Sequence, residues 1–236
     1  VSDMEFFAVT ELYRACTLSG VAALLLMLVS PLYGQQREVA SWNYLALSKG
    51  VGTRWNLAAQ TELRTGENFE SLYLWYVDGN ARYTFNRWFA ASVGFDYIKI
   101  HSSATATRGD VWRTDWRPYI SIIPSFRLGQ VRGSYNLAWT YNWMPETSVD
   151  GVSVHGKAFH LLRHRLSFDY PIANTRFTPY VRAELRHTDK LERVRGTLGT
   201  SIRVNAHASF DAAYVYQDKH LSTKTHALSL GYRIRL

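Results

Sequence analysis

The sequence predicts an all-β protein, an antiparallel up-and-down transmembrane β-barrel of ten to twelve strands. Three observations lead to this fold class. A short apolar segment near the N-terminus has the form of an export signal. Long segments after it alternate between apolar and polar residues with a period of two. Aromatic residues, including 8 Trp and 15 Tyr, make up 14% of the 236 residues, and Trp and Tyr gather at the two interfaces of a membrane.

The first 34 residues have the features of a secretory signal peptide. Arg14 precedes an apolar run over 21–29, and Gly34 supplies a small residue at a plausible cleavage point. A positive flank, a short apolar core and a small residue are typical of such signals. The run is shorter than the roughly 20 residues of a membrane-spanning helix, which disfavours an uncleaved anchor. We expect a signal peptide over 1–34, cleavage near Gly34 and a barrel domain over 35–236.

Cysteine and charge limit the classes of protein further. The single cysteine, Cys16, falls inside the signal, so we expect an exported barrel that contains no disulfide bond. The formal net charge is +8. Basic residues alternate along the strands with apolar ones, whereas nucleic-acid binding favours one exposed basic patch. The pattern therefore disfavours a nucleic-acid partner.

Eleven alternating segments follow the signal. The clearest, 131–143, places Trp139 on one face and Asn136 on the other, because successive side chains of a strand face opposite sides. Soluble strands cluster near five or six residues, whereas crossing a bilayer at a tilt takes about 9–11. The longer segments seen here disfavour a soluble sandwich. In chain order the segments begin near Val39, Trp55, Ser71, Trp88, Val111, Val131, Ala158, Thr175, Leu191, His207 and Lys224.

Eleven is an awkward number of strands. Bacterial single-chain barrels have even strand numbers, and a closed barrel leaves no unpaired edge in lipid. The segment 71–85 changes parity near Val77-Asp78-Gly79, and the first segment, 42–47, is also weak. We therefore expect ten or twelve wall strands.

Connections of two lengths alternate along the chain, as in outer-membrane barrels, whose short turns lie in the periplasm. The short connections are 49–52, 86–87, 128–130, 173–174 and 205–206, and the longer ones are 65–68, 102–110, 144–156, 187–190 and 218–223.

The C-terminal residues resemble the signal read by the outer-membrane barrel assembly machinery. Ser229, Gly231, Ile234 and Leu236 fill its polar, glycine and two apolar positions. We expect this machinery to be a partner of the chain.

The chain also resembles an uncharacterised Gram-negative outer-membrane β-barrel family catalogued as a domain of unknown function. The residues that carry the resemblance are His164-Arg165-Leu166, 179–185, 195–199 and Gly231-Tyr232. It covers most of 38–236. It implies a fold and a location, but no activity, substrate or catalytic residue.

The face predicted to line the lumen is rich in arginine. Our candidates for lumenal anion binding are Arg117, Arg132, Arg163, Arg165, Arg182, Arg186, Arg193 and Arg195, together with Glu184. Arg113, Arg127, Arg176, Arg203, Arg233 and Arg235 share this parity, as do Glu62, Asp115, Asp169 and Asp211. These charges could pair and fill a narrow barrel. They could also line a porin-like path for small anions or grip an anionic ligand, and excess positive charge could contact lipopolysaccharide phosphates.

The competing functional class is an enzyme, a lipid hydrolase or acyltransferase that acts at the rim of the barrel. Its available pieces are His101-Ser102 at the end of a strand and His155, His160 and His164 near a loop, with the last two on the lipid face. A nucleophile needs a base within hydrogen-bond reach, and no G-x-S-x-G motif is present. We expect no enzyme and assign no catalytic residue.

No metal or cofactor is expected either. Glu146, Asp150 and His155 share the longest loop, but the sequence contains no Cys pair, HExxH or calcium-loop motif. We expect a monomer surrounded by outer-membrane lipid and lipopolysaccharide, with a structural role or a role as a narrow conduit.

Overall fold

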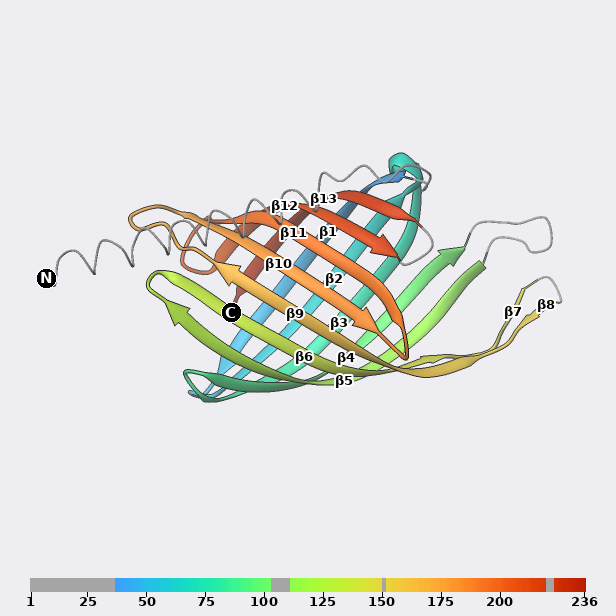
Figure 1. Ribbon diagram of the computed structural model, residues 1–236, viewed down its shortest axis with the longest axis horizontal. Coiled ribbons are helices and arrows are strands. Elements are labelled where there is room, and N and C mark those ends of the chain that lie inside the picture. The colour runs from blue at the N-terminus through green and yellow to red at the C-terminus, as the bar shows by residue number, and fades with distance from the viewer. Residues whose placement is uncertain (1–36, 103–110, 150–151, 220–222) are drawn as a thin grey trace, which may run out of the picture. The chain divides into compact units, whose positions relative to one another are not determined.

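Eleven strands form a closed barrel in the computed structural model of the chain, which describes residues 37–102, 111–149, 152–219 and 223–236. Around the barrel the order is β1-β13-β12-β11-β10-β9-β6-β5-β4-β3-β2 (Figure 1). The wall strands are β1 (Arg37–Val51), β2 (Trp55–Gly66), β3 (Ser71–Asn86), β4 (Phe89–Ser102), β5 (Val111–Leu128), β6 (Val131–Met144), β9 (Lys157–Asp169), β10 (Phe177–His187), β11 (Leu191–Arg203), β12 (Ala208–Lys219) and β13 (Lys224–Arg235). A 3-10 turn, η1 (Glu67–Phe69), follows β2, and β7 (Thr147–Val149) pairs with β8 (Val152–Val154) in a separate hairpin.

The predicted fold class is confirmed, and each of the eleven predicted segments is a wall strand. The expectation of an even number was wrong for the described residues. β1 and β13 run in the same direction and pair in parallel, from Arg37 opposite Lys224 to Ser48 opposite Arg235. Every other neighbouring pair in the wall is antiparallel. A parallel closing pair removes the free edges of a sheet with an odd number of strands.

The alternation sorts side chains between the two faces of the wall, as predicted. Trp55, Ile120 and Trp139 point outward and are 48%, 57% and 42% exposed. Asp115 and Gln217 point inward and are each 1% exposed. Within the described residues no helix is long and apolar enough to span a bilayer.

The suspected parity change in β3 was wrong. Leu74, Tyr76, Asp78, Asn80 and Arg82 all line the lumen, so the strand alternates without a break through this region. The pattern is hard to recognise because apolar side chains point inward at the start of the strand. The irregularities in the pairing of β3 lie on either side of this region, opposite Arg64 and Thr65 of β2 and between Thr84 and Asn86 next to β4.

The connections define two ends of the barrel. The short turns lie together at one end, which we call the short-turn end (Figure 1). The strand ends that lead into the longer connections lie at the other, which we call the long-loop end, and both β1 and β13 run from it to the short-turn end. The predicted signal over 1–34, most of the 102–110 connection and residues 220–222 lie outside the described residues.

Candidate functional site: an arginine-rich lumen

The barrel encloses a cavity of about 460 Å³, a size suited to a small molecule. Arginine dominates its wall, with ten guanidinium groups against three carboxylates. The arginines are Arg64, Arg82, Arg117, Arg163, Arg165, Arg182, Arg186, Arg193, Arg195 and Arg233, and the carboxylates are Asp78, Asp96 and Glu184. The strand pleat places them there, since each lies at an inward-facing position of its strand.

All but one of the predicted anion-binding candidates line this cavity. The exception is Arg132, which is exposed at the short-turn end and pairs in register with Arg127 and Asp169. Its parity is lumenal, but β6 continues beyond the cavity to its turn. Alternation therefore gave the correct face of Arg132 and could not give its depth.

Glu184 connects three of the arginines. Arg165 Nη2 and Nε donate to Glu184 Oε2 at 2.6 and 2.9 Å, and Arg186 Nε donates to Oε1 at 2.8 Å. Arg195 Nη1 lies 3.4 Å from Oε1, and its Nη2 donates to Gln217 Oε1 at 2.8 Å. The Glu184 side chain is 4% exposed, so its charge is balanced by guanidinium groups instead of water. We call this group the glutamate hub.

Three further carboxylates pair locally with cavity-lining arginines. Arg64 Nε lies 2.5 Å from Glu62 Oε1, and Arg117 Nε donates to Asp115 Oδ2 at 2.6 Å. The third pair joins Arg233 to Asp211, which also accepts a hydrogen bond from the Tyr44 hydroxyl.

Four cavity-lining arginines are left without a carboxylate. Within the described part of the chain, Arg82, Arg163, Arg182 and Arg193 form no ion pair and no hydrogen bond to an acidic side chain. Arg182 instead stacks on the Tyr180 ring, with its Cζ 4.0 Å from the ring centroid. The lumen therefore carries positive charge beyond what its own carboxylates balance.

Aromatic side chains narrow the lumen. The centroid of the Trp42 ring lies 4.0 Å from Arg64 Cζ and 4.7 Å from Arg195 Cζ. The second contact joins β1 to β11 across the interior. Tyr119 donates to Asp78 Oδ2 at 2.7 Å, and Asp78 lies directly opposite Asp96 in register.

Sequence reasoning missed these inward aromatics and the Asp78–Asp96 pair. A usable signal was present for Trp42, because the outward Leu45 and Leu47 fix the parity of β1. For Asp78 the unassigned parity of 71–85 concealed the face, and Asp96 lies on the following segment, whose faces were not assigned from the sequence.

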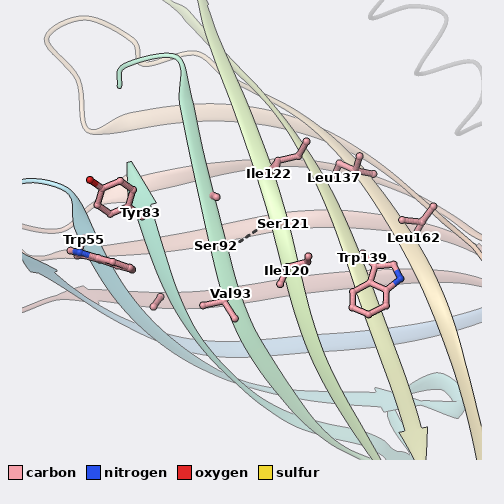
Figure 2. A pocket seen from close by; sticks show the side chains of 12 residues that line it. Trp55, Tyr83, Ser92, Val93, Ile120, Ser121, Ile122, Leu137, Trp139 and Leu162 are labelled. Carbon is pink, nitrogen blue, oxygen red and sulfur yellow. Dashed lines mark hydrogen bonds between the residues drawn. The ribbon is translucent and has the colours of Figure 1, made fainter. Parts of the chain in front are cut away.

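A second pocket, of about 490 Å³, lies on the outward face and is almost wholly apolar. Figure 2 shows side chains of β4, β5 and β6 around it, including Val93, Ile120 and Trp139. A hydrogen bond of 2.7 Å joins the Ser92 hydroxyl of β4 to the Ser121 hydroxyl of the neighbouring strand β5. These residues offer hydrocarbon and no charged group.

Three of the histidines considered for catalysis contact aromatic side chains. His160 stacks on Trp139 with ring centroids 5.1 Å apart, and His164 Nδ1 lies 2.5 Å from the Tyr135 hydroxyl. Both occupy the outward face, as predicted. His101 contacts the Trp112 ring, and the side chain of Ser102 lies outside the described residues.

Within the described residues no group of three or more His, Cys, Asp or Glu side chains is placed to hold a metal ion. Of the loop residues considered as ligands, Asp150 lies outside the described residues.

Two solved barrel structures resemble this chain in architecture and are distant from it in sequence. The chain is similar to the translocator domain of the autotransporter NalP from Neisseria meningitidis, with 12% identity, a TM-score of 0.55 and coverage of 78% of this chain and 80% of that one. It is also similar to the NanC porin, with 12% identity, a TM-score of 0.49 and coverage of 79% and 90%. The first likeness supports the barrel fold.

No curated protein matches the sequence. Residues 39–227 match the family described as "Protein of unknown function (DUF2490)". This match spans the barrel from its first strand into its last, and the chain belongs to that family.

Proposed function

We propose that this chain is an outer-membrane barrel whose lumen binds small anionic solutes and lets them pass. The observation that carries the proposal is the set of four cavity-lining arginines without a carboxylate partner, Arg82, Arg163, Arg182 and Arg193. A purely structural filling would balance its charges, because an unpaired charge in a low-dielectric interior is costly. Arginine-lined pores favour anions.

The dimensions of the lumen favour a small solute. Its free volume is about 460 Å³, and contacts such as Trp42 with Arg195 cross it. Low dielectric walls around an excess of one charge raise the local concentration of counter-ions. The lumen therefore acts as a narrow, selective path or binding chamber for anions.

Single-channel recording of the purified barrel in planar bilayers tests the proposal. Under a KCl gradient we expect discrete openings. We also expect a reversal potential whose sign shows that chloride passes more readily than potassium. Arg182→Gln removes one unbalanced lumenal charge and is expected to shift that potential toward zero. Cation preference, or a folded barrel that never opens, would contradict conduction.

Placement in the membrane has a separate test. Ile120 lies near the middle of β5 and is 57% exposed on the outward face. We expect Ile120→Arg to lower the free energy of unfolding in phospholipid vesicles by about 2–4 kcal/mol, the cost of a basic residue facing lipid at the bilayer midplane.

The matched control is Leu128→Arg at the short-turn end, where the wild-type side chain is 48% exposed. Near the interface the same change costs about 0–1 kcal/mol. Urea titrations followed by tryptophan fluorescence measure both variants. Equal, small effects would indicate that the outward face lies in water.

A further inference from the structure

Four basic side chains occupy one row of the lumen wall. Arg163 of β9 pairs in register with Arg186 of β10, Arg186 with Arg193 of β11, and Arg193 with Lys219 of β12. We call these four residues the basic row. It contains no acidic residue, although like charges directly opposite on neighbouring strands destabilise a sheet. The row therefore maintains a repulsion that a bound anion would relieve.

The row keeps hydrogen-bond donors free. The side chains of Arg163 and Arg193 form no hydrogen bond or ion pair with any residue that the structure describes, and Arg163 Nε is buried without an acceptor. Arg186 uses its Nε for Glu184, which leaves its terminal nitrogens. Arg163 and Arg193 each interact electrostatically with Arg186, which repels them, and with Glu184, which attracts them. Three guanidinium groups that reach the same cavity thus have donors to offer one ligand.

The row lies nearer to the long-loop end than the glutamate hub does. Arg186 is the penultimate residue of β10, Arg193 is the third of β11, and Lys219 is the last of β12. The glutamate hub lies one step deeper, since Glu184 pairs with Arg165 and Arg195. An anion entering from the long-loop end meets the basic row before any carboxylate of the hub.

We propose that the basic row is a binding site for a phosphoryl group, carried by free phosphate or by a small phosphate monoester. This inference rests on the proposed function, because it assigns a ligand class to the same lumen. Arginine presents a planar fork of donors that matches phosphate oxygens bidentately. A dianion with three acceptor oxygens balances three neighbouring guanidinium groups better than a monovalent carboxylate does.

Thermal protection of the folded barrel tests this assignment and does not depend on conduction. A ligand that binds only the folded state raises the unfolding temperature. At about pH 8, above the second ionisation of a phosphate group, we expect inorganic phosphate to raise the midpoint of heat-modifiable gel mobility. Acetate or chloride at equal ionic strength should do so far less. A larger shift with glycerol phosphate than with phosphate would identify a monoester as the preferred ligand.

Two variants locate the site. Arg163→Gln and Arg193→Gln should each weaken phosphate binding about tenfold or more, the loss of one charge-assisted hydrogen-bonding partner. Without phosphate both should be at least as stable as the wild type, because like-charge repulsion falls. Arg82→Gln is the matched control. It removes another unpaired lumenal arginine, on β3 outside the row, and should leave phosphate protection intact.

The outcomes separate the two proposals. The phosphoryl site would be overturned if acetate protected the barrel as well as phosphate does. It would also be overturned if the Arg82 and Arg193 variants lost phosphate protection to the same extent. Neither result would contradict an anion-selective lumen. Phosphate protection that depends on Arg163 and Arg193 in a barrel with no channel activity would support the site and contradict conduction.

Discussion

Replacing Glu184 by Gln is expected to lower the free energy of unfolding by about 3–5 kcal/mol, the range for removing one partner of a buried ion pair. The carboxylate is the common acceptor for Arg165, Arg186 and Arg195. Without its charge, three guanidinium groups face one another in a narrow lumen, with the basic row beside them. The neutral amide keeps the size of the side chain, so the decrease in the free energy of unfolding reports on the loss of the charge.

Urea unfolding in phospholipid vesicles measures the effect. Glu192→Gln is the matched control, because Glu192 lies next to the inward Arg193 on β11 and so faces the other side of the wall. A substitution outside such a network usually stays within about 0.5 kcal/mol. If Glu184→Gln cost no more than this control, the hub would not stabilise the barrel.

A double-mutant cycle separates the hub from a general effect of lumenal charge. Arg186→Gln removes one of the cations that Glu184 balances. In combination with Glu184→Gln, the total loss should be smaller than the sum of the single losses, because fewer guanidinium groups remain unbalanced. Strict additivity would argue that the two side chains do not interact.

The sequence allows the face of most lumenal arginines to be predicted, because the pleat is a local property. Arg82 is the exception, since the parity of 71–85 was not assigned. The alternation of Arg182, Glu184 and Arg186 along β10 requires no knowledge of neighbouring strands, and all three line the cavity. The same logic placed Trp139 and Ile120 on the outward face. Strand positions and side-chain faces follow from short stretches of chain.

Register is not local, and the site depends on it. That Arg186 lies opposite Arg163 and Arg193, while Glu184 lies opposite Arg165 and Arg195, is set by how three strands align. A shift of two residues would preserve every face and pair different charges. The parallel closure between β1 and β13 is non-local in the same sense. The alternation predicts eleven segments, but it could not show that the first and the last pair in parallel and so permit an odd number of strands.

Replacing Gly231 by Ala is expected to prevent normal closure of the barrel. A Cβ atom at this position would lie 2.1 Å from Cζ of Tyr44, which is directly opposite on β1. The ring cannot move aside freely, because its hydroxyl bonds to the buried Asp211 and accepts a hydrogen bond from Arg233 Nη2 at 3.0 Å. Overpacking and the lost hydrogen bond together should destabilise the protein by about 3 kcal/mol. Refolding in vesicles, followed by heat-modifiable gel mobility, measures the folded fraction.

Gly231 is also a candidate residue of the C-terminal assembly signal, so its substitution could act through recognition instead of packing. Refolding without the assembly machinery separates the two causes, since only a steric clash persists there. Gly79→Ala is the matched control, because no atom lies within 4 Å of a Cβ at that position. The combination of Gly231→Ala with Tyr44→Ala should be no less stable than Tyr44→Ala alone, because the clash disappears with the ring. If Gly231→Ala instead refolds like the wild type and fails only in cells, the glycine serves recognition, and the parallel seam does not depend on the close contact with Tyr44.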